Sequence, residues 1–309
     1  MKLRHLVSVA DLSKEEIEAL FQETHILKEA LRKGEPDNSL AGKTLALVFE
    51  KPSARTRISF EVAMTQLGGH ALYLSREDIG LGVRETVKDF ALMASRQVDA
   101  IAARTFAHST IEELAENSSV PVINALSDYL HTCQALTDLF TIQEKLRSLK
   151  DVKLAYVGDG NNVARSLAVT CAKLGVRFTV SSPEGYGLSD DFMAFLKTLV
   201  PGDLKGIFSQ TTNPQDAVKK SDVVYTDVWA SMGEEAEAAE RKKIFRPFQV
   251  NSELLKFAKP ESLVMHCLPA HRGEEITDEV IDSPQSIVFD QAENRLHIAK
   301  AVLKFLLCQ

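Results

Sequence analysis

The 309-residue sequence has few features of a secreted, membrane or nucleic-acid-binding protein. It contains one Trp and four Cys, and the cysteines form no CxxC pair, which favours a reduced intracellular chain over a disulfide scaffold. No apolar run approaches the length of a membrane span, and the N-terminal segment lacks the apolar core of a signal peptide. The net charge of −7 disfavours non-specific nucleic-acid binding. We therefore expect a cytoplasmic protein in which any anion site is a local cluster of basic residues.

A metal site is also poorly supported by the sequence. His266, Cys267 and His271 lie close together along the chain. No fourth ligand at a typical spacing accompanies them. We therefore expect no bound metal.

Short apolar runs alternate with helical patterns along the chain. Predicted strands cover residues 44–49, 71–74, 99–103, 122–125, 153–157, 177–181, 222–227, 263–268 and 287–289, and predicted helices include 85–96, 109–117, 130–149 and 162–174. This alternation is typical of α/β proteins with parallel sheets, and nine strands exceed one small sheet. The sequence thus predicts two doubly wound parallel-sheet domains joined by long helices. We expect the domains at residues 1–145 and 146–290, with a final helix, 291–309, packing back on the first.

The stretch FEKPSARTRISFEVAMTQLGG, residues 49–69, places cations where a helix should begin. Lys51, Arg55 and Arg57 crowd this helix start, although the helix macrodipole disfavours positive charge there. An anion bound to the free N–H groups of the first turn would make the arginines favourable ligands. The stretch therefore predicts a phosphate site. The alternative is a basic surface turn in which Ser53 is a plain N-cap.

Polar residues also follow other predicted strands, at the edge where open α/β sheets bind ligands. His131 and Gln134 are three residues apart and share one helical face; a structural role and a ligand-binding role fit them about equally. Asp227 and Cys267 each end a predicted strand. Together these two could face a cationic group.

The segment GDGNN, residues 158–162, resembles a dinucleotide loop only superficially. Val163 stands at the third glycine position, and Asp159 would repel a pyrophosphate. This argues against an NAD-dependent dehydrogenase. Asn161 and Asn162 suit a ligand with amine or carboxylate groups, or they serve only as turn and cap residues.

Seven motifs occur in a fixed order across the whole chain: SARTR, RTFAH, HTCQ, GDGNN, DVWASMG, HCLPA and ENR. Together they resemble the aspartate/ornithine carbamoyltransferase family. SxRTR marks that family as a whole, whereas DxxxSMG with HCLP is typical of its ornithine branch. The resemblance implies carbamoyl transfer from carbamoyl phosphate to the δ-amine of L-ornithine, giving citrulline and phosphate in the arginine pathway. It also implies no cofactor, no metal, and homotrimers with interfacial active sites.

The resemblance further assigns individual residues to the two substrates. Those implied for carbamoyl phosphate are Ser53, Ala54, Arg55, Thr56, Arg57, Arg104, His131, Gln134, Cys267, Leu268 and Arg295. Those implied for ornithine are Asn162, Asp227, Ser231 and Met232. The implied catalytic residues are Arg104, His131, Cys267 and Arg295. Cys267 and the Leu268 carbonyl would align the δ-amine, and the peptide bond after Leu268 is cis in relatives.

Three positions depart from the family pattern. Ala54 replaces a threonine, and Thr132 replaces a proline. Gly80 stands where relatives place a Gln or His that reaches the site of a neighbouring subunit. We expect Arg84 to supply that missing contact across the interface, or else to be a solvated loop cation. Because no charged catalytic group is lost, we expect changed affinity for carbamoyl phosphate and retained activity.

Other functions stay open at this stage. A carbamoyltransferase acting on an acylated ornithine or a diamine is the alternative within the class. Outside the class, the alternatives are an NAD-dependent dehydrogenase and a non-catalytic amino-acid-binding regulator. A regulator would not need a phosphate site.

Overall fold

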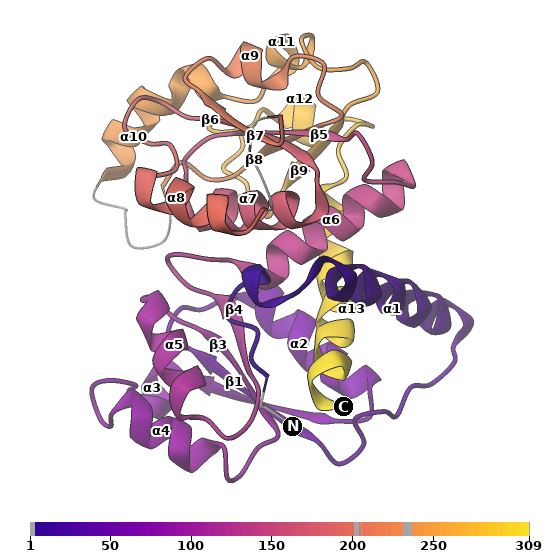
Figure 1. Ribbon diagram of the computed structural model, residues 1–309, viewed down its shortest axis with the longest axis vertical. Helices are drawn as coiled ribbons and strands as arrows, with labels where there is room; N and C mark the ends of the chain where they lie inside the picture. Colours follow the sequence, from indigo (N-terminus) through magenta and orange to yellow (C-terminus); the bar gives the residue numbers. More distant parts are fainter. Residues whose placement is uncertain (1–3, 201–203, 205, 231–236, 309) are drawn as a thin grey trace. The chain divides into compact units, whose positions relative to one another are not determined.

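The computed structural model describes residues 4–200, 204, 206–230 and 237–308. The chain forms two compact units: unit 1 is Met1–Thr137 with Glu293–Gln309, and unit 2 is Asp138–Ala292. Each unit contains a parallel sheet with flanking helices (Figure 1). The predicted α/β class with two doubly wound sheets is therefore confirmed. None of the described helices is long and apolar enough to cross a membrane.

The sheet of unit 1 has the strand order β2-β1-β3-β4 and is parallel throughout. Its strands are β1 (Thr44–Phe49), β2 (His70–Ser75), β3 (Ala100–Arg104) and β4 (Val122–Leu126). Its helices are η1 (Val9–Asp11), α1 (Lys14–Lys33), α2 (Ala54–Gln66), α3 (Arg76–Ile79), α4 (Val87–Ala94) and α5 (His108–Asn117). The boundaries between the units fall within α6 (Thr132–Leu146) and α13 (Val288–Leu307).

Helices pack on the unit 1 sheet, and its inner strands β1 and β3 are accordingly almost entirely buried, whereas the edge strand β2 is partly exposed. Ala46 and Val48 of β1 pack in one cluster with Phe90 of α4 and Leu114 of α5. Helix α2 contacts β1 and β2. In unit 1 the end of α13 also contacts α1, where Lys304 forms an ion pair with Glu23 at 2.7 Å.

The sheet of unit 2 has the order β7-β6-β5-β8-β9 and is also parallel. Its strands are β5 (Lys153–Val157), β6 (Arg177–Ser181), β7 (Phe208–Thr211), β8 (Val223–Thr226) and β9 (Leu263–His266). Its helices are α7 (Asn162–Leu174), α8 (Asp190–Thr198), α9 (Pro214–Val218), α10 (Ala238–Phe245), η3 (Arg246–Phe248), α11 (Ser252–Leu255) and α12 (Asp278–Ile281). One face packs in a cluster that includes Ala155, Val224, Val264 and Val280.

Two strand predictions were wrong. In the predicted strand 287–289, residue 287 precedes α13 and the other two residues begin that helix; the preceding Ser286 forms an isolated bridge to Val264. A run of three apolar residues suits a strand or the first turn of a helix equally well. Strand β7 was not predicted because Phe208–Thr211 is short and mostly polar, as an edge strand is free to be. The other eight predicted strands are present.

Candidate active site

Helix α2 begins after the loop that follows β1, and its first turn is arranged in a way that suits a bound anion. Ser53 is the N-cap of α2, and its Oγ accepts a hydrogen bond from the Thr56 backbone N–H at 3.3 Å. Ala54 follows as the first helical residue. Arg295 of α13 donates from Nη2 to Thr56 Oγ1 at 2.9 Å and from Nη1 to Gln134 Oε1 at 2.7 Å. Three segments far apart in sequence therefore meet at this helix start.

Two more predicted residues belong to the same electropositive cluster. Arg104 ends β3, and His131 lies directly before α6; both are buried. The pKa of His131 is held well below its usual value, first by burial and then by the charges of Arg295, Arg104 and Arg55. His131 is therefore neutral near pH 7, and a neutral imidazole can donate one hydrogen bond without adding charge. The surrounding guanidinium groups supply the positive potential.

Arg57 does not share this cluster with Arg55. Its Nε donates to Glu61 Oε1 at 2.9 Å, and its guanidinium lies 3.9 Å from the centre of the Tyr73 ring. Two residues of a helix are separated by about 200° around the axis, so Arg55 and Arg57 point in different directions. The prediction that both arginines clamp one anion does not fit this placement.

Thr132 compensates locally for the missing proline. Its Oγ1 donates to the backbone carbonyl of Val7 at 2.9 Å. This bond ties the turn before α6 to the N-terminal segment of unit 1. A hydrogen bond thus restrains a turn that a proline ring would otherwise stiffen.

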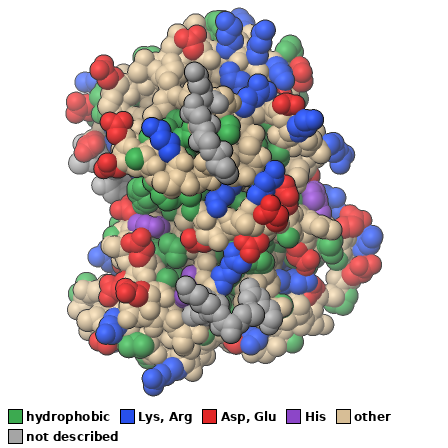
Figure 2. Space-filling view, in the orientation of Figure 1, with side chains coloured by type: hydrophobic (Ala, Val, Ile, Leu, Met, Phe, Trp, Pro, Cys, Tyr) green, Lys and Arg blue, Asp and Glu red, His purple; other side chains and the backbone are tan. Residues whose placement is uncertain are grey.

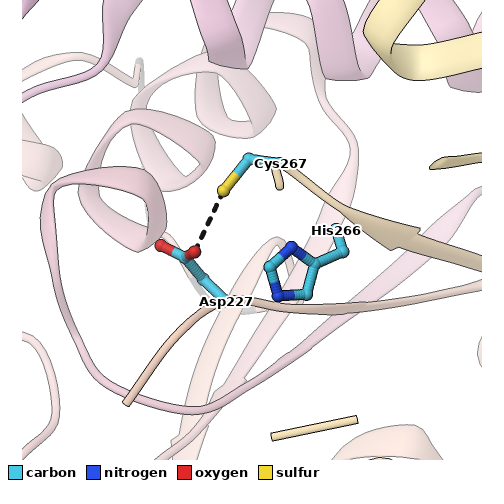
Figure 3. A group of neighbouring side chains, drawn as sticks. All are labelled: Asp227, His266 and Cys267. Carbon is cyan, nitrogen blue, oxygen red and sulfur yellow. Dashed lines mark hydrogen bonds between the residues drawn. The ribbon is translucent and has the colours of Figure 1, made fainter. Parts of the chain in front are cut away.

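A second polar cluster lies at the carboxyl edge of the unit 2 sheet. Asn161 caps α7, with Oδ1 accepting from the backbone N–H groups of Val163 at 2.9 Å and Ala164 at 3.1 Å. Its Nδ2 donates to Asp227 Oδ2 at 2.9 Å. The Cys267 thiol donates to Asp227 Oδ1 at 3.0 Å, as Figure 3 shows. Asp227 and Cys267 therefore lie side by side, because their strands β8 and β9 are neighbours.

The other residues expected for ornithine are less fully defined. Asn162 is the first residue of α7 and is half-buried. Leu268 has a φ of 58° and precedes a cis peptide bond to Pro269. Ser231 and Met232 lie outside the described residues. Asn161, which received no ligand role from the resemblance, is one of the donors to Asp227. Its position before a helix predicted the cap but not the bond to Asp227.

Comparison with known protein families matches both halves of the chain. The carbamoyl-P binding domain of aspartate/ornithine carbamoyltransferases matches residues 4–144, and the Asp/Orn binding domain matches residues 150–306. The chain belongs to the aspartate/ornithine carbamoyltransferase family. We call the residues at the start of α2 the α2 cluster: Ser53, Arg55, Thr56, Arg104, His131, Gln134 and Arg295. The first match contains all of them except Arg295, and the second contains Arg295, Asp227 and Cys267.

Individual members of the carbamoyltransferase family are similar over almost the whole chain. The ornithine carbamoyltransferase of Pyrococcus abyssi is 54% identical over 307 residues, covering 99% of this chain and 96% of that protein. An ornithine carbamoyltransferase of Bacillus subtilis is 51% identical over 304 residues, covering 98% and 94%. The solved structure of the Pyrococcus furiosus ornithine carbamoyltransferase has a TM-score of 0.95 at 53% identity, covering 99% and 97%.

In this carbamoyltransferase chain, both ring nitrogens of His266 are already used. Nδ1 accepts from the Leu268 N–H at 2.8 Å, and Nε2 lies 3.0 Å from Glu275 Oε1. The proton must therefore be on Nε2. Asp227, His266 and Cys267 lie close enough to share a metal ion (Figure 3). Such an ion would have to break one of the histidine bonds.

Gly80, which departs from the carbamoyltransferase pattern, lies against the side chain of Arg84. Gly80 ends α3 with a φ of 56°, and a Cβ added there would lie 3.0 Å from the Arg84 Cβ. Arg84 is exposed, and its Nη1 donates to the Asp78 carbonyl at 3.3 Å. The Arg84 side chain thus occupies the space that a longer side chain at position 80 would need.

Proposed function

We propose that this chain is an ornithine carbamoyltransferase. It transfers the carbamoyl group of carbamoyl phosphate to the δ-amine of L-ornithine and releases citrulline and phosphate. The observation that carries this proposal is Asp227, a buried carboxylate with 6% exposure that forms no ion pair with any described residue. Burying an uncompensated charge is unfavourable. The α-ammonium group of a free amino acid would compensate it.

The α2 cluster suits carbamoyl phosphate for the complementary reason. Its phosphate would accept hydrogen bonds from the first-turn N–H groups of α2 and from Arg55. The Arg104 guanidinium and neutral His131 would donate to the carbonyl oxygen. This proposal is supported by the number of cations that gather there with a buried, uncharged imidazole.

The proposed reaction transfers the carbamoyl group between these two substrates. The neutral δ-amine attacks the carbonyl carbon, and negative charge develops on the carbonyl oxygen. Arg104, His131 and Thr56 stabilise that charge as it forms, in surroundings from which water is largely excluded. The C–O bond to phosphate then breaks, the δ-nitrogen gives up one proton to the departing phosphate oxygen, and hydrogen phosphate leaves toward α2 and Arg55. Carbamoyl phosphate is already an activated donor, so we propose no metal or cofactor.

We also propose that each of the two domains binds one of the substrates. Residues 1–145 with 291–309 form the carbamoyl phosphate-binding domain, and residues 146–290 form the ornithine-binding domain. The bonds of Arg295 to Thr56 and Gln134 support placing the final helix with the first domain. By analogy with the family, the active enzyme is a cytoplasmic homotrimer of the arginine biosynthetic pathway.

A substrate comparison tests the proposal. Citrulline-type product should form fastest with L-ornithine, and far more slowly with Nα-acetylornithine, Nα-succinylornithine or putrescine, because each of these lacks part of the α-amino acid group. A preference for an acylated ornithine would contradict the role of Asp227. Quenching of nicotinamide fluorescence by the protein would instead favour a dehydrogenase.

The Asp227→Asn variant tests the same point by mutation. The substitution keeps the side-chain size and removes the negative charge. Ornithine binding should weaken strongly, whereas carbamoyl phosphate binding, measured by direct titration, should barely change. Equal weakening for both substrates would indicate damage to the fold.

A further inference from the structure

A groove of about 420 Å³ lies on one face of the unit 2 sheet, along β6 and β7. The polar residues that line it are Lys153, Arg177, Thr179, Ser209, Gln210, Thr211 and Asp216. Lys153 pairs in register with Arg177, and Thr179 pairs with Ser209. Cations and hydroxyl groups of neighbouring strands therefore stand side by side in this groove.

The side chains of both cations donate hydrogen bonds to backbone carbonyls. Lys153 Nζ donates to the backbone carbonyl of Lys219 at 2.7 Å, and Arg177 donates to the backbone carbonyl of Asp151. Neither side chain forms an ion pair within the part of the chain that the structure describes. The pKa of Lys153 is lowered by burial first and then by the charge of Arg177, while Asp222 opposes the shift. A bound anion would offset both the cost of burying the Lys153 charge and its repulsion from Arg177.

The hydroxyl pair adds a directional donor. Thr179 Oγ1 and Ser209 Oγ lie 2.9 Å apart, so one donates to the other and one hydroxyl proton stays available. Asp216 also lines the groove, but it is not among the charges that shift the pKa of Lys153. On the face shown in Figure 2, Lys and Arg side chains of unit 2 gather on one side and Asp and Glu side chains on the other.

The cationic end of the groove is distinct from the ornithine cluster. Lys153 and Arg177 are the first residues of β5 and β6, whereas Asn161 and Asp227 follow the carboxyl ends of β5 and β8. A five-residue strand separates its two ends by about 13 Å. A ligand held by Lys153 and Arg177 would therefore not compete with ornithine for Asp227.

We propose that this groove binds a small multivalent oxyanion: a free polyphosphate or the polyphosphate group of a nucleotide. Lys153 and Arg177 hold the charged oxygens, and the Thr179–Ser209 hydroxyl pair donates a further hydrogen bond. The volume of about 420 Å³ lies within the usual range for small-ligand sites. The groove would recognise the cluster of anionic oxygens in such a ligand.

Inorganic tripolyphosphate is a suitable first probe, used with the full-length chain in calorimetric titrations at low ionic strength. All titrations use an Arg55→Ala background, which weakens anion binding at α2. That protein should bind one tripolyphosphate per chain. Adding Lys153→Met and Arg177→Met should weaken binding at least tenfold, whereas adding Lys197→Met, on an exposed residue of α8, should not. Equal affinity of the groove variant and the Lys197 control would overturn the proposal.

Further ligands and one conservative variant complete the test. ATP binding more tightly than tripolyphosphate would identify a nucleotide, and equal binding would identify polyphosphate alone. Adenosine binding as tightly as ATP would refute recognition through the anionic oxygens. Lys153→Arg keeps the charge and should keep the affinity. Lost affinity in that variant at an unchanged melting temperature would also count against the site.

Discussion

Replacing Asn161 by serine would separate two tasks that one amide side chain performs. Its Oδ1 caps α7, and its Nδ2 donates to Asp227 Oδ2 at 2.9 Å. Serine is an equally good N-cap, so most of the roughly 1 kcal/mol that a cap supplies should be retained. The donor to the buried carboxylate is lost. A hydrogen bond to a charged group contributes about 1.5–3 kcal/mol, which corresponds to about tenfold to 150-fold in affinity.

Steady-state citrulline formation at varied ornithine concentration measures this effect. The KM for ornithine should rise within that range in Asn161→Ser, while the KM for carbamoyl phosphate stays nearly unchanged. Asn161→Ala is the matched control: it loses the donor and the cap, so urea unfolding should show a further loss of about 1 kcal/mol. An unchanged ornithine KM in Asn161→Ser would refute the inference that this bond positions Asp227 for its substrate.

Four further outcomes follow from the same structure. Arg55→Ala should lower kcat/KM about 30-fold to 1000-fold, equivalent to about 2–4 kcal/mol of transition-state stabilisation, and wild-type kinetics would contradict the phosphate site. In a Cys308→Ser background, alkylation of Cys267 should abolish activity and both substrates together should protect; full activity of labelled protein would place the thiol away from the amine. Burial, followed by the charge of a nearby lysine, lowers the pKa of His297 to about 4 from 6.5. Between these pH values the unfolded chain binds more protons than the folded chain, so the free energy of unfolding should fall with falling pH, by at most about 1.4 kcal/mol per pH unit. His297→Gln should flatten this slope, and an unaltered slope would show that His297 is not its source. Refolding Arg84→Ala chains with Arg55→Ala chains should restore both arginines in about a quarter of the sites of a closed ring, and recovery no greater than the parent activities would place Arg84 outside the neighbour's site.

Local sequence patterns were sufficient to predict most of the fold. Eight strands were located because a buried parallel strand is a short apolar run whatever lies beside it. The approach of Asp227 to Cys267 was also predictable, since both residues end strands and parallel strands end at a common edge. The same local reasoning failed at 287–289, where three apolar residues do not distinguish a strand from a helix start.

The direction of long side chains was decided only by tertiary structure. Cations at the start of α2 were visible in the sequence, but only the structure shows that Arg57 turns to Glu61 and Tyr73. Arg295 reaches Thr56 across 239 positions of the chain, and no spacing rule predicts such a bond. Each of these side chains has several rotamers of similar energy, and the packed surroundings select one of them.

The sequence by itself thus determined the α/β class, the two sheets and the kinds of residue that end their strands, because these depend on neighbours along the chain. Only the tertiary structure decided that His131 is uncharged and that Asn161 orients Asp227. The protonation state of a side chain depends on burial and on charges within a few ångströms, which come from distant parts of the sequence. Hydrogen-bond partners are likewise selected by proximity in space, after strand pairing has aligned the carboxyl ends of the strands within each sheet.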